Sequence, residues 1–586
     1  MTINHHSRRA KYRSPGGAQP CGTQVRLFLK TDAPEAVVRY WIGDHAYLYK
    51  MSSVEGGFAH TIKLPDEPGI VWYYFIVGDL YYGNAPDNMG GVGAIYPHEP
   101  PSYQITVYDP AFAPPAWLGD GVMMQIMPDR FHRGGNYACR GRLHADWYEP
   151  PEMRLTITGD NEADDFFGGD LKGITQKLPY IKSLGVTVIY LNPIFQAHSN
   201  HKYDTADYAR IDPAFGTEAD FQELCAAARA LGIRIVLDGV FSHTGADSIY
   251  FNKFGNFDSV GAYNDPNSAY ADWYTFHEWP DDYDCWWGFQ TLPNVSKQSK
   301  TFRDFIIHAP DAICARWIRA GASGWRLDVA DELPMDFIRA LRARVKAQDA
   351  EAAIIGEVWE DPSRKVTYGE LRSYCLGDTL DSTMNYPLRA AILGFFTGKL
   401  SSEQCARAIE SLLENMPWAF ARSLMNLISS HDKPRALAVF SDVGNMEPER
   451  RYRYPIKLTD AQYARGRRRL IAAWRMVCAL PGMPTVYYGD EAGLYGMSDP
   501  YCRAAYPWGR EDAGLIEEFR DAIAMRKQHG ALIDGDVTFE TPDDDVLIIR
   551  RRLDGKTCAL AINRSDYAYE YHKIKIGAER AEWFYE

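Results

Sequence analysis

The sequence has no long apolar run and no dense block of basic charge. No window comes near the roughly 18 uninterrupted apolar residues that a membrane-spanning helix needs. The first twenty residues are basic and polar, but no apolar stretch of the kind found in a secretion signal follows them. The formal net charge is -14, and no basic run is longer than RGRRR at 465–469, so nucleic acid and anionic lipid are disfavoured as partners. We therefore expect a soluble protein that binds neither nucleic acid nor membrane.

Paired cysteines are also missing. The ten cysteines are scattered singly, and none forms a CxxC pair. Several lie in helix-like surroundings, such as Cys225 in FQELCAAARA and Cys478 in AAWRMVCALPG. Buried free thiols are the expected state, and such thiols fit a reducing compartment, so the sequence predicts a cytoplasmic protein.

The length of 586 residues exceeds one ordinary core and predicts several domains. Residues 1–20 form a basic tail that we expect to be disordered. Over 21–110, short β-branched and aromatic runs alternate with Gly, Pro and Asp clusters, which predicts a β-sandwich. Similar runs over 526–586 predict a short C-terminal β domain, also of the sandwich type.

Residues 111–525 alternate strand-like and helix-like segments, which is typical of an α/β fold. The strand candidates are 121–127, 186–192, 233–239, 324–330, 352–358, 380–386, 424–430 and 484–490. Eight such repeats predict a (β/α)8 TIM barrel, whose functional groups lie at the C-terminal ends of the strands. Residues 240–300, between the third and fourth strands, are too long for a simple connection and predict an inserted domain.

Four short segments each place an acid at the polar end of an apolar run. They are Asp238-Gly-Val-Phe-Ser-His243, Gly324-Trp-Arg-Leu-Asp328, Gly356-Glu-Val-Trp359 and Ser429-Ser-His-Asp432. A single acid of this kind is usually a turn residue or a helix cap. Four acids at the ends of barrel strands would instead converge on one rim. Together with an arginine and two histidines, they favour acid/base chemistry on a neutral polar substrate.

These segments, in this order, resemble the signature regions of the alpha-amylase family of glycoside hydrolases. Supporting segments are Met127-Pro-Asp-Arg-Phe131, Phe166-Phe-Gly-Gly-Asp-Leu171, Leu191-Asn-Pro-Ile-Phe195, Asn200-His-Lys-Tyr-Asp-Thr-Ala-Asp-Tyr208 and Tyr487-Tyr-Gly-Asp-Glu491. The chain is most similar to the neopullulanase, cyclomaltodextrinase and maltogenic amylase branch, with amylopullulanases close by. The resemblance covers nearly all of 22–586. It implies retaining hydrolysis of α-1,4 glucosidic bonds, with α-1,6 bonds left open, in maltooligosaccharides, cyclodextrins, pullulan or starch.

The resemblance implies a separate role for each acid. Asp328 matches the nucleophile, Glu357 the acid/base and Asp432 the acid that stabilises the transition state. Asp238 matches a supporting acid. Arg326 lies two residues before Asp328 on the same face of the strand, so we expect it to keep Asp328 ionised. The apolar surroundings of Glu357 are expected to raise its pKa towards the working range.

The same resemblance implies a set of sugar-binding side chains. His243 and His431 match the histidines that hydrogen-bond the sugar in the cleaved subsite. Tyr203 matches the aromatic residue on which that sugar stacks, and His201 accompanies it. Aromatic rings stack on the C–H faces of sugars, so Trp359 is a further candidate platform. Three other aromatic residues can equally belong to the core: Trp286, Trp287 and Phe289. Glu491 can equally be structural.

The chain departs from this branch at its calcium site. There the loop after the first strand carries Asn and Asp ligands, whereas 131–139 reads FHRGGNYAC here. Asn136 is its only candidate side-chain oxygen, while Gly168 and Asp170 match the rest of the site. Calcium needs about six to eight oxygens, and the cationic Arg133 lies among the candidates. The chemistry requires no cofactor, and a structural calcium and a metal-free loop both stay open.

Other functions also stay open at this point. Transglycosylation is the same double displacement with a sugar hydroxyl in place of water, so these residues fit an α-glucan transglycosylase equally well. A non-catalytic glucan-binding protein would be expected to lack one of the three acids. The partner in each case is an α-glucan oligosaccharide or polysaccharide. The N-terminal domain could bind starch or pack against a second subunit to form a homodimer.

Overall fold

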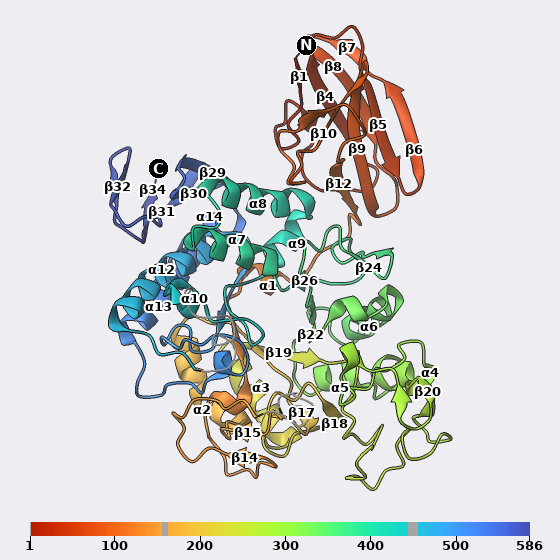
Figure 1. The fold of residues 1–586 in the computed structure, drawn as a ribbon, viewed down its shortest axis with the longest axis vertical. Helices are drawn as coiled ribbons and strands as arrows, with labels where there is room; N and C mark the ends of the chain where they lie inside the picture. The colour runs from red at the N-terminus through yellow and green to blue at the C-terminus, as the bar shows by residue number, and fades with distance from the viewer. Residues whose placement is uncertain (1, 155–161, 444–454, 586) are drawn as a thin grey trace.

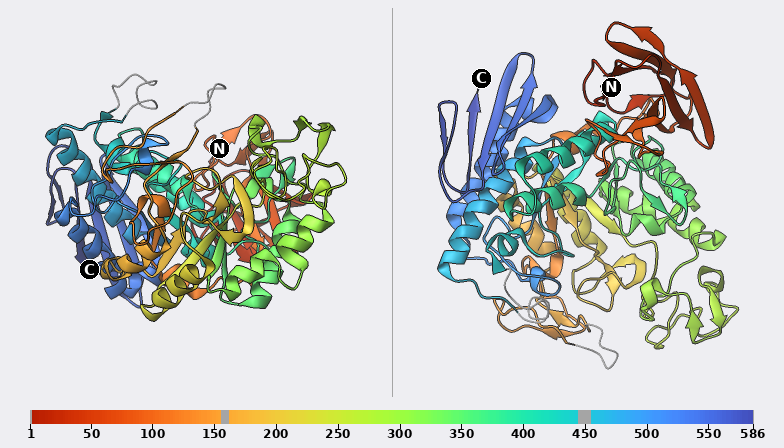
Figure 2. Two further views of the ribbon diagram at one scale, coloured as in Figure 1. Left: turned by 90° about the horizontal axis from the view of Figure 1, so that it is seen from below. Right: turned by 45° about the horizontal axis from the view of Figure 1, so that its top comes forward.

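The computed structural model describes residues 2–154, 162–443 and 455–585. A central barrel carries an N-terminal pair of sheets and a small C-terminal sheet, both above the barrel in Figure 1 and in the right view of Figure 2. Helix α8 (Ser402–Asn415) touches both, because it contacts β12 (Tyr103–Tyr108) of the N-terminal part and β29 (Asp536–Asp543) of the C-terminal part.

The N-terminal part consists of two packed sheets, as predicted. One contains β1 (Ile3–Asn4), β2 (Arg13–Ser14), β4 (Gln24–Thr31), β7 (Ser52–Val54) and β8 (Gly57–Lys63). The other contains β3 (Gln19–Pro20), β5 (Val37–Ile42), β6 (His45–Lys50), β9 (Gly69–Val77), β10 (Leu80–Gly83), β11 (Ala94–Tyr96) and β12. Alternating side chains such as Val25, Leu27 and Leu29 of β4 are buried between the sheets.

The prediction of a disordered tail over 1–20 is wrong for the described residues 2–20. His5 is buried, and its ring nitrogens lie 2.8 Å from Phe28 O and 3.0 Å from Tyr73 Oη. Burial lowers the pKa of His5 to about 3, so its ring is neutral. Arg13 is buried as well and pairs with Glu414 of α8. The basic residues of this segment suggested a solvated tail because their partners lie far away in the sequence.

Eight parallel strands form the barrel sheet, in the spatial order β26, β23, β22, β19, β16, β13, β28, β27. They are β13 (Met123–Ile126), β16 (Val188–Leu191), β19 (Arg234–Gly239), β22 (Gly324–Leu327), β23 (Ala353–Gly356), β26 (Ser382–Thr383), β27 (Met425–Leu427) and β28 (Met483–Tyr487). A parallel bridge between Met384 and Met425 brings the two ends of the sheet together. Each predicted strand overlaps one of these, which confirms the barrel.

Helices surround the barrel, and several begin at a side-chain cap. Thr217, Ser401 and Thr459 each form a capping box, which satisfies the free N–H groups at the helix start. The longer helices are α2 (Leu171–Ser183), α3 (Glu218–Ala230), α5 (Ile313–Arg319), α6 (Met335–Gln348), α7 (Tyr386–Phe396), α8, α12 (Asp460–Ala479) and α13 (Ala513–Gln528). The shorter ones are α1 (Ala116–Asp120), α4 (Lys300–Arg303), α9 (Trp418–Ser423), α10 (Ala436–Phe440) and α14 (Gly530–Asp534).

The connections at the C-terminal ends of the strands contain only short elements. Strand β14 (Arg142–Leu143) pairs with β15 (Asp165–Phe166), and β17 (Phe195–Ala197) with β18 (Thr205–Ile211). The long segment after β19 contains η2 (Ala271–Trp273), β20 (Phe276–Glu278), β21 (Asp282–Tyr283), η3 (Trp286–Gly288) and, after α4, η4 (Asp304–His308). The remaining short elements are η1 (Pro128–Arg130), η5 (Ala330–Glu332), β24 (Val366–Thr367), β25 (Glu370–Leu371) and η7 (Tyr501–Arg503).

The C-terminal part is a four-stranded antiparallel sheet with a hairpin packed on it. The sheet contains β29, β30 (Val546–Leu553), β31 (Lys556–Asn563) and β34 (Arg580–Tyr585), and the hairpin contains β32 (Tyr569–Tyr571) and β33 (Ile574–Ile576). The predicted boundary at 525/526 is wrong, since α13 runs through it and the strands begin only at Asp536. In none of the three described ranges is a helix both long and apolar enough to span a membrane.

Candidate active site

Three of the four predicted acids lie at the C-terminal ends of barrel strands, and Asp432 lies in the segment that follows β27. Asp238 lies within β19, while Asp328 and Glu357 follow β22 and β23 directly. These three strands are neighbours, with Asp238 opposite Arg326 and Leu327 opposite Gly356. Parallel strands end at the same edge of a barrel, so acids at equivalent positions on neighbouring strands are brought together.

Arg326 is the shared partner of three of these acids. Its Nη1 atom lies 2.8 Å from Asp238 Oδ1 and 2.7 Å from Asp328 Oδ1. Its Nη2 atom lies 2.9 Å from Glu357 Oε2. Asp328 and Glu357 therefore flank one buried guanidinium, which places their carboxyl groups side by side.

Asp238 is the acid best stabilised as an anion. Besides Arg326, the hydroxyl groups of Tyr190 and Tyr203 donate to its Oδ2 atom at 2.6 and 2.8 Å. Three donors occupy this carboxylate, and its side chain is fully buried. Asp238 thus holds Arg326 and Tyr203 in position, as a supporting acid would.

One cation does not balance three buried carboxylates. Burial raises the pKa of Asp328, the charges of Glu357 and Asp238 raise it further, and Arg326 only opposes the rise. Burial and the charge of Asp432 likewise raise the pKa of Glu357. Burial raises the pKa of Asp238 as well, but Arg326 and the two tyrosine hydroxyl groups oppose this rise, so a proton retained by the cluster is placed better on Asp328 or Glu357. One ionised and one protonated carboxyl is the state that retaining glycoside hydrolysis starts from.

The backbone at Val329 adopts an unusual conformation that allows it to bind Glu357. Its φ angle is 39°, in the left-handed region that is costly for a β-branched residue. In this conformation its N–H group donates to Glu357 Oε2 at 2.8 Å. The residue after Asp328 therefore fixes the carboxyl group that follows the next strand.

His431 links Asp432 to Tyr203. Its Nδ1 atom accepts from Gln125 Nε2 at 2.8 Å, so the ring proton lies on Nε2. Nε2 lies 2.6 Å from Tyr203 Oη and 3.2 Å from Asp432 Oδ2. Burial and the charges of Arg503 and Arg326 keep the pKa of His431 well below its usual value, so the ring is neutral.

The rings of Tyr203 and His431 are nearly parallel, with centroids 5.3 Å apart and an interplanar angle of 6°. Because their polar atoms Oη and Nε2 are only 2.6 Å apart, the rings lie edge to edge and His431 does not cover a face of Tyr203. His201 lies beside it, where its Nδ1 atom accepts from Tyr203 N at 3.1 Å and lies 3.0 Å from Ser199 Oγ. His201 thus supports the loop that carries Tyr203.

His243 is buried on the other side of this loop. Its Nε2 atom lies 3.1 Å from Tyr203 O, and its Nδ1 atom lies 2.9 Å from Ser242 Oγ. Burial lowers its pKa to about 3. The ring of Trp286 lies 5.5 Å from it, whereas Trp287 is 78% exposed. The inserted segment therefore places an aromatic residue at the edge of the site.

Trp359 has both faces of its ring covered. Tyr386 stacks on one face, with centroids 4.1 Å apart and an interplanar angle of 4°. The ammonium of Lys433 lies 4.1 Å from the centroid of the Trp359 ring, as a cation–π contact. In this arrangement Trp359 offers no free face to a sugar.

Sequence reasoning missed Arg503, which lies in η7 after the last barrel strand. Its Nε atom donates to His431 O at 2.9 Å, and Nη2 lies 3.6 Å from Asp432 Oδ1. Burial raises the pKa of Asp432, and the positive charge of Arg503 opposes this rise more than any other group does. Nothing in the local sequence identifies Arg503, because 72 residues separate it from His431.

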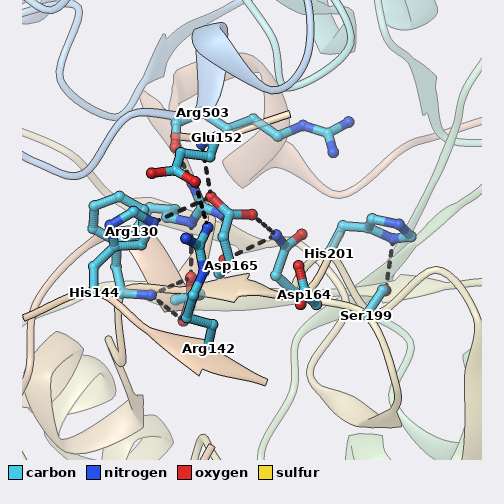
Figure 3. A network of polar contacts seen from close by, with 12 residues as sticks. Arg130, Arg142, His144, Glu152, Asp164, Asp165, Ser199, His201 and Arg503 are labelled. Carbon is cyan, nitrogen blue, oxygen red and sulfur yellow. Dashed lines mark hydrogen bonds and ion pairs between the residues drawn. The ribbon is translucent and has the colours of Figure 1, made fainter. Parts of the chain in front are cut away.

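A buried polar network connects Arg503 to the loop after the first barrel strand (Figure 3). Arg130 Nη1 donates to Arg503 O at 2.9 Å, and Arg130 Nη2 donates to Asp165 O at 2.9 Å. Asp165 also accepts from Asn200 Nδ2 at 2.7 Å. The network connects three separate loops to Arg503, which lies beside Asp432.

Glu491 lies outside this cluster of acids. Its Oε1 atom accepts from Tyr180 Oη at 3.0 Å and from Tyr506 Oη at 2.9 Å. Burial raises its pKa to about 7. These contacts connect α2 to the segment after β28, which favours the structural interpretation of Glu491.

The residues predicted to hold calcium do not fit that ion. Both oxygens of Asp170 are occupied, since Oδ2 accepts from Gly134 N and Gly135 N at 3.0 and 2.8 Å and Oδ1 accepts from Gly173 N at 2.7 Å. Arg133 donates to two nearby carbonyl groups, with Nε 2.6 Å from Phe167 O and Nη2 2.6 Å from His144 O. A guanidinium thus stands where a cation would need oxygen ligands.

The other two predicted ligands do not change this conclusion. Asn136 is exposed, and Gly168 donates its N–H group to Asp129 Oδ1 at 2.9 Å. Within the described ranges, no three His, Cys, Asp or Glu side chains gather so that they could hold a metal ion.

Comparison with known proteins gives a consistent result. The family model described as alpha amylase, catalytic domain, matches residues 125–537. The amylopullulanase of Thermoanaerobacterium saccharolyticum is 36% identical over 96% of this chain and 48% of its own length. The cyclomaltodextrinase of Geobacillus thermopakistaniensis is 35% identical over 78% of this chain and 71% of its own length. The chain therefore spans less than half the length of that amylopullulanase.

Solved structures show the same similarity. The type III pullulan hydrolase from Thermococcus kodakarensis has a TM-score of 0.68 at 26% identity, with 99% of both chains covered. The cyclic alpha-maltosyl-(1→6)-maltose hydrolase from Arthrobacter globiformis, in its ligand-free form, has a TM-score of 0.68 at 30% identity. That match covers 81% of this chain and 99% of the other.

Proposed function

Because the chain belongs to the alpha-amylase family, we propose that it is a retaining hydrolase of α-glucosidic bonds. Its substrates would be maltooligosaccharides, cyclodextrins, pullulan or starch, cleaved at α-1,4 and also at α-1,6 bonds. The names of the relatives, which include amylopullulanase and cyclomaltodextrinase, support this range. The observation that carries the proposal is the single guanidinium of Arg326 shared by Asp328 and Glu357.

The reaction follows from the roles proposed for the acids. Asp328 attacks the anomeric carbon while Glu357 gives its proton to the leaving oxygen, so one C–O bond forms and one breaks. The product of this step is a glycosyl–Asp328 ester. Glu357, now ionised, takes a proton from water, and the water oxygen displaces Asp328. The same anomeric configuration results from the two inversions.

The other residues would stabilise this path. Asp432 is partly exposed, with 28% of its side chain accessible, so it can contact sugar hydroxyls and the positive charge that develops on the ring. Neutral His431 and His243 were predicted to hydrogen-bond the same sugar unit, but protein groups occupy both ring nitrogens of each, so they would instead hold Tyr203 and Asp432 in position. The ring of Tyr203 would stack on that sugar unit.

Transglycosylation remains the second candidate, because a sugar hydroxyl can replace water in the second step. The two are separated by products formed at high concentrations of a maltooligosaccharide acceptor. Longer products would favour transfer, and hydrolysis products alone would favour the first function. A non-catalytic glucan-binding protein would show binding with no turnover.

The proposal extends to location and assembly. All ten cysteines are free thiols in the structure, which supports the cytoplasm. A homodimer through the N-terminal sheets would narrow access to the site. Light scattering, combined with activity on cyclodextrin and on starch, tests this, since a monomer that prefers starch would contradict it.

The decisive experiment follows the anomeric configuration of the product by proton NMR with maltotriose or cyclodextrin. We expect the α-anomer first, followed by mutarotation. An Asp328→Asn variant should lose at least about a thousandfold in kcat yet still bind maltotriose in calorimetry. Undiminished turnover in this variant, or an initial β-anomer, would overturn the proposal.

A further inference from the structure

Lys433 occupies a position next to the reacting groups that the proposed mechanism does not use. It follows Asp432 directly, and its backbone N–H group donates to Ser430 O at 3.4 Å. Its ammonium lies on the ring of Trp359, whose opposite face is taken by Tyr386. The lysine is only partly exposed. It thus covers the one face of Trp359 that would otherwise be open.

The ammonium has donors but no acceptor. Over the described residues, Lys433 Nζ forms no hydrogen bond and no ion pair with another protein group. An ammonium carries three N–H donors, and at this partly exposed place they are open to the hydroxyl groups of a bound sugar. Burial and the charge of Arg389 lower the pKa of Lys433, while Asp432 and Glu357 oppose this effect. The site thus holds an ammonium group that is not paired with a carboxylate of the described residues.

The neighbours of Lys433 indicate on which side of the scissile bond it lies. The acid/base protonates the leaving oxygen, so the groups nearest to it on the far side from the nucleophile meet the leaving part of the substrate. Trp359 comes two residues after Glu357, and Lys433 rests on it. The leaving sugar would therefore encounter an ammonium group and not an aromatic face.

We propose that Lys433 is a specificity-determining residue for the leaving-group side, where its ammonium donates hydrogen bonds to hydroxyl groups of the leaving glucose unit and keeps the Trp359 ring from acting as a stacking surface. This inference rests on the proposed function. In a transfer reaction the same hydrogen bonds would hold the acceptor sugar. A sugar supplies several hydroxyl oxygens, whereas a flat aromatic leaving group supplies a ring that needs a bare platform.

Three variants separate the hydrogen bonds from the covering of the ring. Lys433→Ala removes both, Lys433→Met removes the donors but leaves a chain that still covers Trp359, and Lys433→Arg keeps both. The substrates are maltotriose, whose leaving group is a sugar, and 4-nitrophenyl α-maltoside, whose leaving group is an aromatic ring.

We expect opposite effects on the two substrates. With maltotriose, kcat/KM should fall about tenfold in the Ala and Met variants, as for the loss of a hydrogen bond from a charged donor, and stay near wild type in the Arg variant. With the aryl maltoside, KM should fall severalfold in the Ala variant alone, because only there is the Trp359 face exposed. A general structural defect would weaken both substrates together.

The pH profile provides a second readout. Arg503, Arg326 and Lys433 face Asp432 and oppose the rise of its pKa, with neutral His431 beside it. Losing the charge of Lys433 raises the pKa of Asp432. Activity that needs ionised Asp432 is therefore lost at a higher pH as the solution is made more acidic. The acid limb of kcat/KM should shift upward in the Ala and Met variants and stay in place in the Arg variant.

Failure of this inference is distinguishable from failure of the proposed function. If the wild type hydrolyses both substrates and the three variants match it in kcat/KM, in KM and in pH profile, Lys433 has no such role. Loss on both substrates in the Ala variant would also overturn it. If the wild type turns over neither substrate, the proposed function fails. Calorimetry with maltotriose on Asp328→Asn and on Asp328→Asn/Lys433→Ala then tests the hydrogen bonds alone, and equal affinities would overturn them.

Discussion

The guanidinium of Arg13 lies 2.6 Å from the carboxylate of Glu414, although 401 residues separate them along the chain. Both side chains are buried, with 1% and 6% exposed. Arg13 belongs to β2 of the N-terminal part, and Glu414 to α8, which packs on the barrel. The pair therefore fastens the N-terminal sheets to the catalytic part.

Breaking this pair should destabilise the protein. Glu414→Gln leaves the buried Arg13 without its counter-charge, which costs about 3 kcal/mol, and it also removes one of the two carboxylates that pair with Arg8. The free energy of unfolding in urea measures the change. Glu410→Gln is a matched control on the same helix, because Glu410 pairs with Arg8 while 35% exposed, and its loss should cost under about 1 kcal/mol. Equal effects of the two variants would contradict the anchoring role.

Arg326 should control the pH range of activity. Arg326→Gln removes the cation that opposes the raised pKa values of Asp328 and Glu357, so both values rise further. The nucleophile must be ionised, so activity falls when the pH drops below its pKa. Because this pKa is higher in the variant, the loss begins at a higher pH. We expect the acid limb of kcat/KM to shift upward by about one pH unit or more.

The measurement is kcat/KM between pH 4 and 8 with the aryl maltoside. Arg316→Gln is the control, since Arg316 pairs with Glu218 on the outer helices and is 32% exposed. An unchanged pH profile in Arg326→Gln would show that this guanidinium does not set the ionisation of the acids.

Glu491 should make stability fall as pH rises towards neutrality. Its folded-state pKa is about 7, above the value of 4.5 expected for an unfolded chain. The folded state therefore retains the proton more strongly, and the resulting stability is fully present below about pH 4.5 and lost as pH rises through 7. The amount is on the order of 3 kcal/mol.

Glu491→Gln should remove this dependence, because an amide stays neutral and still accepts from both tyrosines. Its melting temperature relative to wild type should therefore increase between pH 5 and pH 8, as measured by calorimetry. Glu517→Gln, at an exposed position of α13, serves as the control. A constant difference across this range would be inconsistent with a titrating Glu491.

Calcium should be unnecessary for the loop after β13. Arg133 already binds the carbonyl groups of Phe167 and His144, so chelation by EDTA should leave the melting temperature of the wild type within about one degree. Arg133→Ala should lower it by several degrees, because two buried carbonyl groups lose their donor. Added calcium should not restore it. A drop caused by EDTA in the wild type would refute this interpretation.

Local sequence patterns were enough to predict most of the barrel strands and the acids that follow them. Runs such as IRIVL before Asp238 and AAIIG before Glu357 are buried strands whose period and length are set by neighbouring residues alone. Because parallel strands of a barrel end on the same rim, the order of four such segments was enough to predict that the acids converge. The contact of Arg326 with Asp328 follows from their spacing of two on one strand.

What the sequence determined by itself is therefore the set of strands, the identity of the acids and the family they resemble. Only the tertiary structure decided that Arg503 lies beside Asp432, that Lys433 and Tyr386 cover Trp359, that Arg133 donates to the carbonyl groups of Phe167 and His144, and that Arg13 pairs with Glu414. Each of these depends on groups that only the folded chain brings together. Sequence patterns report periodicity over a few residues, whereas the burial and charge of such pairs are fixed only when the chain has folded.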